Sequence, residues 1–409
     1  YATYPEVVVV ERGPYLEPVL NLACLGAAWV WLSSTPSPRR IFVAGALFAA
    51  ACAVKVWGGL WLIAALVSLP SGDQRTGPAL DSLPAAVRGD LSTGVAMRRG
   101  WRGALLPFLA GAIVAGLVLV GPLALAAPRA FLEDVLVFHA WRPPDGDVAR
   151  LPRLWTIWWD VHRVCSVLAL GGIALGLMRR ELRASRELRF FGAAYALTVA
   201  AFLLPTAYWN QYNAHLAPSE AVLAGWGGCE LFRFLVAPRL PALAGRTRLA
   251  ILAIAIAAFP SLRRSILNSR ARAPELLELG DRLRSTIPPD ACLFAFEPAW
   301  GMAGGFLPPH GIPGGPVIVD PYAAMLRDAT AGGVRYPHAA AAFRSDASQA
   351  AARAMLERCR FAVLGWRGHW QLTEATQSWF RERYVPHTST EHYDVWENTS
   401  GGGERGRHP

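Results

Sequence analysis

The sequence predicts a polytopic α-helical membrane protein followed by a small extracytoplasmic α/β domain. The chain of 409 residues is 53% hydrophobic and only 17% charged, whereas soluble domains carry about 25% charged residues. Long apolar runs alternate with short connectors, and every second connector is rich in arginine, which is typical of a chain threaded repeatedly through a bilayer. The apolar surplus ends near residue 262, and the remainder has the composition of a soluble domain.

Eight apolar runs define the predicted membrane part. They cover residues 16–34, 41–54, 56–70, 104–127, 164–178, 190–206, 216–236 and 249–261. A helix needs about 20 apolar residues to cross a bilayer core, so the shorter runs are expected to extend by a few residues. We interpret the break at 55–59 as a hairpin, because one span over 41–70 would place the arginines of 71–102 outside the cytoplasm.

Arginine placement orients these runs. The arginine-rich connectors, which are predicted to face the cytoplasm, are 39–40, 75–102, 179–189 and 239–248. The turn at Lys55 and the connectors 128–163 and 207–215 then lie outside, together with the chain after residue 263. The last run, 249–261, is short, and a re-entrant segment there would instead leave the tail inside.

Three parts follow from this pattern: a transmembrane helical domain over 1–262, an extracytoplasmic α/β domain over 263–399, and a disordered tail over 400–409. In the second part, spacing and composition predict helices over 275–285 and 347–358, strands over 292–296, 317–320 and 361–366, and loops over 301–316. No signal peptide is visible ahead of these parts, and the chain is expected to be the carboxyl-terminal portion of a longer protein.

Charge and cysteine content narrow the partners and the compartment. The net charge is +10, but the arginines concentrate in connectors where they orient a membrane protein, so nucleic acid is not an expected partner. Four of the six cysteines lie in apolar runs, where cysteine behaves as a small hydrophobe. Cys292 and Cys359 lie in the tail: an oxidising compartment permits a disulfide between them, and two free thiols are the alternative.

Two charged residues beside apolar runs are candidates for function. Glu17 stands at the outer end of the first run, where a carboxylate is costly and commonly functional. The alternative is an interfacial residue in the first helical turn, ahead of Pro18, whose charge suits the helix dipole. Lys55 is placed to meet a lipid phosphate as a mobile point charge; the alternative is a side chain that only extends to the interface.

Two outer connectors carry groups that bind sugars and phosphates. The loop 138–146 contains His139 and Arg142, and a guanidinium offers a bidentate fork to phosphate. The connector 208–215 contains Tyr212 and His215 and suggests a polar cavity, with a solvated connector of interfacial aromatics as the alternative. The sequence contains no Walker loop and no HExxH, GxSxG or paired CxxC motif.

The order of these motifs resembles a known family. Residues 15–18 (Tyr-Leu-Glu-Pro) head a Leu/Ala-rich helix, and an apolar stretch from Phe48 leads to Ala-Val-Lys at 53–55. With the Arg-Pro-Pro-Asp-Gly loop at 142–146 and the stretch 211–218, this order over about residues 1–240 resembles the GT-C superfamily of membrane glycosyltransferases. The branch it resembles is glycosyltransferase family 39, the type of protein O-mannosyltransferases and lipid A aminoarabinose transferases.

The resemblance implies a multi-pass enzyme of the plasma or inner membrane. Such an enzyme transfers a sugar, with inversion, from a polyprenyl-phosphate donor to a glycan, lipid or protein acceptor on the extracytoplasmic side, and many members use a divalent metal ion. It implies that Glu17 is a second acidic residue of the catalytic cavity and that Lys55 lies near the donor phosphate. The principal catalytic Asp is expected upstream of Tyr1. The other candidate substrate-binding residues are His139, Arg142, Tyr212 and His215.

Two other functional classes remain open from the sequence. A secondary transporter or lipid flippase places charged groups near the bilayer midplane and shows internal repeats. No repeat is evident here and the polar groups gather at one face, although Glu220, Glu230 and Arg233 lie in the seventh run. The third class is a non-catalytic membrane scaffold whose tail binds cell-wall partners. The sequence favours the enzyme.

Overall fold

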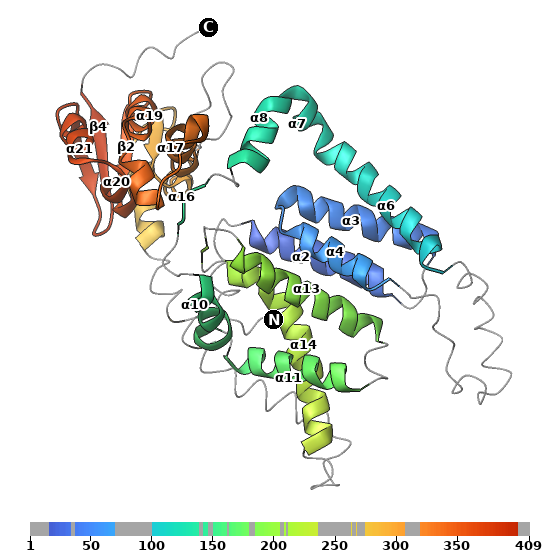
Figure 1. Ribbon diagram of the computed structural model, residues 1–409. Coiled ribbons are helices and arrows are strands. Elements are labelled where there is room, and N and C mark those ends of the chain that lie inside the picture. The colour runs from blue at the N-terminus through green and yellow to red at the C-terminus, as the bar shows by residue number, and fades with distance from the viewer. Residues whose placement is uncertain are drawn as a thin grey trace, which may run out of the picture. The chain divides into compact units, whose positions relative to one another are not determined.

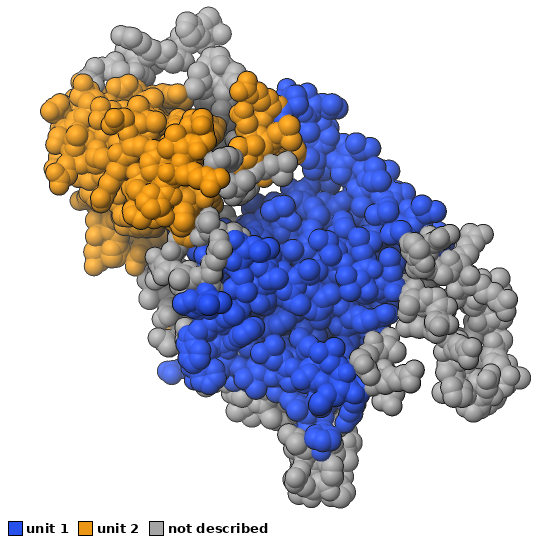
Figure 2. Space-filling model, viewed as in Figure 1, with its two compact units in different colours: residues 1–128, 148–266 blue, residues 129–147, 267–409 orange. Residues whose placement is uncertain are grey.

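The computed structural model divides the chain into two compact units (Figure 2). One contains residues 1–128 and 148–266, and the other contains 129–147 and 267–409. The connector 129–147 therefore belongs with the carboxyl-terminal unit, whereas the sequence grouped it with the helical part. The described residues are 16–33, 37–69, 100–138, 142–145, 150–161, 163–179, 185–204, 208–209, 212–235, 263, 267, 275–306 and 320–399.

The first unit is built of helices (Figure 1). Its elements are α2 Glu17–Leu32, α3 Pro38–Val54, α4 Gly58–Val67, α6 Gly100–Leu119, α7 Gly121–Ala126, α10 Arg150–Trp155, η3 Thr156–Val161, α11 Arg163–Met178, α13 Arg186–Leu203 and α14 Asn213–Leu235. Seven of the eight apolar runs thus form helices, and 104–127 forms two of them. The eighth run, 249–261, lies outside the described residues.

Local sequence explains where the helices begin. Ser37 caps α3 by accepting a hydrogen bond from the backbone of Arg40 at 3.3 Å, with Pro38 in the first helical position. Ser185 caps α13 through Leu188 N–H at 3.2 Å. The predicted break after α3 is confirmed: the chain turns at Lys55, whose carbonyl accepts from Gly58 N–H at 2.9 Å before α4 begins.

The helices alternate in direction between two ends of the unit. Lys55, at the end of α3, meets Glu17, at the start of α2, so these two helices are antiparallel. At the other end of α2, Trp31 Nε1 donates to Ser68 Oγ at 2.9 Å, just after α4, so α2 and α4 are parallel. The guanidinium of Arg186, at the start of α13, lies 4.3 Å from the Trp31 ring. One end therefore holds Glu17 and Lys55, and the opposite end holds Arg186.

Helices of this unit approach closely where glycines face a neighbour. A Cβ on Gly45 of α3 would lie 2.0 Å from the Phe108 oxygen of α6, and one on Gly227 of α14 would lie 2.3 Å from the Leu168 oxygen of α11. Only glycine permits these two backbones to approach so closely. Contacts of this kind between small residues are common where helices pack within a membrane.

Large apolar side chains of α6 and α7 face outward. Leu106, Leu117 and Val118 are 71%, 66% and 66% exposed, and Leu125 is 84% exposed. Considered one at a time, the described helices are not long and apolar enough to cross a bilayer, although the bent pair Leu151–Trp159 and Arg163–Met178 passes the same test when combined.

The second unit carries a four-stranded sheet with the order β1-β2-β4-β3 (Figure 1). The strand β1 Leu293–Ala295 is parallel to β2 Phe361–Leu364, and both are fully buried. The hairpin of β3 Tyr384–Ser389 and β4 Asp394–Asn398 adds to β2 in antiparallel fashion. Its helical elements are α8 Pro128–Leu132, η2 Glu133–Val137, 275–286, α16 Pro298–Ala303, α17 Pro321–Thr330, η6 Ala331–Gly333, α18 Ala339–Phe343, α19 Asp346–Leu356, α20 Trp366–Gln371 and α21 Glu374–Arg381.

The predicted helices and the two apolar strands of this unit are confirmed to within a few residues, but other predictions are corrected. Residues 301–303 complete α16 and are not a loop, because Pro298 starts a helix that the glycines do not interrupt. Of the predicted strand 317–320, residues 317–319 lie outside the described residues, and Asp320 caps α17 by accepting from Tyr322 N–H. The β3–β4 hairpin was not predicted.

A disulfide joins the two cysteines of this unit. Cys292 and Cys359 are bonded, with their Cα atoms 4.8 Å apart. That separation lies in the usual range for a disulfide. Cys292 directly precedes β1 and Cys359 lies two residues before β2, so the bridge ties the starts of two neighbouring strands together. Of the two alternatives left open by the sequence, the structure contains the bridge.

Candidate functional site

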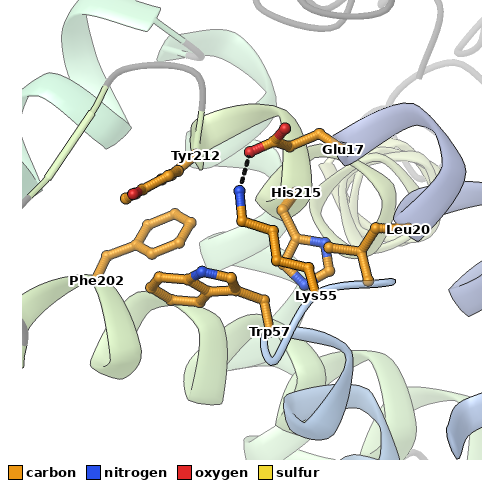
Figure 3. Close-up of a pocket in the computed structure, with 7 residues that line it drawn as sticks. All are labelled: Glu17, Leu20, Lys55, Trp57, Phe202, Tyr212 and His215. Atoms are coloured by element: carbon orange, nitrogen blue, oxygen red, sulfur yellow. Dashed lines mark hydrogen bonds and ion pairs between the residues drawn. The ribbon is translucent and has the colours of Figure 1, made fainter. Parts of the chain in front are cut away.

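A pocket at one end of the helical unit collects polar and aromatic side chains from four separate segments (Figure 3). It is narrow and closely packed, with no space for a water-sized molecule between the lining side chains. The lining residues are Glu17 and Leu20 of α2, Lys55 and Trp57 of the turn before α4, Phe202 of α13, and Tyr212 and His215 at the start of α14. Four of the six residues predicted from sequence therefore meet in one place.

An ion pair between Glu17 and Lys55 lies at the centre of the pocket. Figure 3 shows the ammonium and the carboxylate facing each other above the aromatic rings. The Glu17 side chain is only 3% exposed and that of Lys55 is 22% exposed, so the lysine is the partner that solvent reaches. The ammonium also lies 4.8 Å from the centre of the Tyr212 ring, a distance at which a cation and an aromatic face attract each other.

Lys55 is the single lysine among the 40 lysine and arginine residues of the chain. Arginine supplies every other basic side chain, including those of the arginine-rich connectors. An ammonium is a compact point charge on a flexible stem, whereas a guanidinium is a planar fork, and the two are not interchangeable. The one position at which the chain has a lysine in place of an arginine thus lies in the pocket. This signal was present in the sequence, but it was not used in predicting the site.

Aromatic rings form the wall of the pocket next to Lys55. The Trp57 ring lies 5.2 Å from Phe202 and 5.3 Å from Tyr212, measured between ring centres. Arg153 supports this wall from behind: it donates to the Phe202 carbonyl at 2.9 Å and lies 5.0 Å from the Tyr208 ring. The wall presents a flat apolar surface beside a cation, which suits a sugar or a prenyl chain attached to phosphate.

His215 lies next to the Lys55 side chain (Figure 3) and is 2% exposed. Its Nδ1 atom is 2.9 Å from Oδ1 of Asn21, and Asn21 Nδ2 donates to the Ala214 carbonyl at 2.9 Å. Asn21 was missed by sequence reasoning, because an asparagine within an apolar run gives no indication of a partner 194 residues away.

The two connector residues predicted for the site, His139 and Arg142, belong to the connector that groups with the second unit. His139 lies outside the described residues. Arg142 forms an ion pair with Asp145 at 3.0 Å and lies over the Tyr322 ring at 5.5 Å, both within the second unit. The Tyr322 hydroxyl donates to the same Asp145 carboxylate. The described contacts of Arg142 therefore hold the connector to the carboxyl-terminal domain.

A second arginine of that domain extends the cluster. Arg367 also lies over the Tyr322 ring, at 5.5 Å from its centre. Its guanidinium approaches the Glu297 carboxylate at 3.5 Å. Burial raises the pKa of the Glu297 carboxyl above its usual value, and the charge of Arg367 partly offsets that effect.

The described part of the pocket does not fit a metal ion. Its residues include one carboxylate, which already faces an ammonium, and one imidazole. Across the described residues, no three His, Cys, Asp or Glu side chains group closely enough to hold a metal. We therefore derive no chemical step through a metal.

Comparison of the chain with protein-family models, with curated proteins and with solved structures found no significant match.

Proposed function

We propose that this protein is a membrane glycosyltransferase that moves a sugar from a polyprenyl-phosphate donor to an acceptor at the extracytoplasmic face. The observation that carries the proposal is the pocket itself. Glu17, the only lysine of the chain, and the Tyr212 and His215 side chains converge there from distant parts of the sequence.

The membrane location is supported by three features of the helical unit. The outward side chains of α6 and α7 are large and apolar, as expected of a surface that meets lipid acyl chains. Close helix contacts through Gly45 and Gly227 suit packing within a membrane. Arg186 marks the end of the unit opposite to the pocket, which agrees with the cytoplasmic assignment of the arginine-rich connectors.

Chain connectivity supports an extracytoplasmic site. The connector after α7 begins on the side of the membrane where α6 and α7 end, which the arginine pattern predicts to be outside. Its residues 142–145 are bonded into the carboxyl-terminal domain, through Tyr322 and through Ala339 N–H, which donates to the Pro144 carbonyl at 2.9 Å. That domain holds the Cys292–Cys359 disulfide, and disulfides persist in oxidising compartments.

The chemistry follows from the groups in the pocket. Lys55 binds the donor phosphate and neutralises the charge that develops as the bond from the sugar C1 to the phosphate oxygen breaks. The phosphate competes with Glu17 for the ammonium and releases the carboxylate. Glu17 then accepts a hydrogen bond from the acceptor hydroxyl and takes its proton as the hydroxyl oxygen bonds to C1, while polyprenyl phosphate leaves with the electron pair of the broken bond. The Trp57 and Tyr212 rings hold the sugar or the first prenyl units.

Binding to polyprenyl phosphate tests this function. The full-length protein in lipid nanodiscs should bind polyprenyl phosphate, but not the matching polyprenyl alcohol, and Lys55→Met should lose the preference for phosphate. Lys55→Arg, which keeps the charge, is the matched control and should retain part of the binding. Equal binding of phosphate and alcohol by the wild-type protein would contradict the proposal.

A transporter or flippase is the second candidate, because one buried group favours it. Glu220 of α14 is fully buried and accepts a hydrogen bond from Ser166 of α11, well inside the helical unit. Carboxylates in such positions often mark a transport path. Loss of polyprenyl-phosphate flipping in Glu220→Gln, with sugar transfer absent from the wild-type protein, would favour this candidate.

A further inference from the structure

Asn21 is a buried polar residue to which the reaction above gives no role. It follows Glu17 by one helical turn in α2 and is 1% exposed. Its amide nitrogen donates to the Ala214 carbonyl, and its amide oxygen lies 2.9 Å from His215 Nδ1. These two bonds join the helix that carries Glu17 to the first turn of α14.

The direction of these bonds fixes the tautomer of His215. A backbone carbonyl only accepts hydrogen bonds, so the amide nitrogen of Asn21 faces Ala214 and its oxygen faces the imidazole. Nδ1 of His215 must then carry a proton and donate it to that oxygen. In a neutral imidazole the other nitrogen, Nε2, has no proton.

The surroundings of His215 favour that neutral form. The ring is buried, its partner is an amide and not a carboxylate, and the Lys55 ammonium lies in the same pocket. The other titratable groups that line the pocket are Tyr212 and Glu17, and Glu17 is paired with Lys55. An interaction between the imidazole and the Trp57 backbone favours the charged form, but the buried Nε2 atom makes no hydrogen bond of good geometry to a described residue, and burial and the Lys55 charge outweigh that interaction. A second positive charge here would meet both desolvation and the ammonium.

We infer that Asn21 is a positioning residue that holds His215 neutral, with Nδ1 protonated, in the pocket that contains Lys55. The inference rests on the proposed function, in which Lys55 binds the donor phosphate. With His215 neutral, Lys55 is the one cation among the described lining residues of the pocket. Loss of Asn21 would let the imidazole rotate and would free the start of α14, which carries Tyr212.

The tautomer can be read directly by ¹⁵N NMR. Full-length protein labelled with ¹⁵N-histidine is placed in nanodiscs, and the His215 signals are identified by their loss in His215→Gln. We expect a protonated Nδ1 and a bare Nε2 in the wild-type protein, and a mixture of tautomers in Asn21→Leu. Thr198→Val is the matched control: it removes a buried hydroxyl whose hydrogen bond, among the described residues, is to the Ala194 carbonyl of its own helix at 2.7 Å, and it should leave the His215 signals unchanged. A protonated Nε2 in the wild-type protein, or an unchanged tautomer in Asn21→Leu, overturns the inference.

Binding of polyprenyl phosphate to the same samples separates this inference from the proposed function. Asn21→Leu should bind the phosphate about tenfold more weakly, because it leaves buried polar groups unsatisfied beside the site, whereas Thr198→Val should bind like the wild-type protein. If the wild-type protein binds and Asn21→Leu binds equally well, the positioning role is wrong and the proposed function stands. If the wild-type protein shows the expected tautomer but does not bind, the proposed function fails, and with it the role of Asn21 in phosphate binding.

Discussion

The ion pair between Glu17 and Lys55 can be tested by a double-mutant cycle on stability. Lys55→Met leaves a carboxylate with a 3% exposed side chain and no counter-ion. An uncompensated buried charge costs about 3–5 kcal/mol, and because water reaches the lysine side of the pocket we expect the lower limit, about 3 kcal/mol. Glu17→Gln leaves an ammonium that still contacts solvent and the Tyr212 ring, so its loss should be smaller, about 1–2 kcal/mol.

The double variant separates the attraction between the two side chains from the cost of leaving one buried charge without its counter-ion. It leaves neither charge, so its loss of stability should be smaller than the sum of the single losses by about 2 kcal/mol. Thermal denaturation of the three variants in nanodiscs measures this coupling. Losses that simply add would refute the ion pair as the main interaction of these two residues.

The order of these variants in affinity for polyprenyl phosphate should differ from their order in stability. Lys55→Met and the double variant should both bind polyprenyl phosphate at least about tenfold more weakly, or about 1.4 kcal/mol, although the double variant is the more stable of the two. Glu17→Gln should retain binding but lower sugar transfer by the full-length protein at least about tenfold, with expression and membrane insertion intact. Full transfer by Glu17→Gln would exclude its assigned role.

Three further predictions concern the framework around the site. A cysteine placed at the exposed Ser378 should react with an impermeant reagent on intact cells, and labelling only after lysis would contradict the eight-run topology. Cys359→Ser should destabilise the carboxyl-terminal domain by about 2–4 kcal/mol under oxidising conditions, measured by its denaturation, and should have no effect if the bridge never forms. Gly45→Leu should cost about 1–3 kcal/mol by forcing α3 away from α6. Gly26→Leu is its control, because a Cβ there meets nothing within 4 Å, and equal losses would show that the close approach is unimportant.

The sequence predicted those site residues whose position along the chain is itself informative. Glu17, Lys55 and Tyr212 stand at the ends of apolar runs, and a helix that ends at a membrane face places its end residues near those of its neighbours. Alternating runs therefore predicted a shared location without any knowledge of packing. The single lysine is a further signal that the prediction did not use, although it needs only a count of residues.

Residues that act through tertiary contacts could not be predicted in this way. Asn21 and Phe202 lie within apolar runs and acquire their roles only when α2, α13 and α14 pack together. Arg142 lies in a loop with the composition of a phosphate-binding loop, yet its described partners include Asp145, close by in sequence, and Tyr322, which is distant in sequence. The β3–β4 hairpin was missed because its strands are mostly polar and lack a continuous apolar face.

The most direct test of the proposed donor site uses the single lysine of the chain as its own reporter. Full-length protein in nanodiscs is treated with an amine-acylating reagent, and mass spectrometry follows modification of the peptide that contains Lys55, with polyprenyl phosphate or the matching polyprenyl alcohol present. If the ammonium binds the donor phosphate, polyprenyl phosphate should slow acylation of Lys55 at least about tenfold at saturating concentration, and the alcohol should not. Acylation at the same rate with both lipids would contradict the assignment of this pocket to a polyprenyl-phosphate donor.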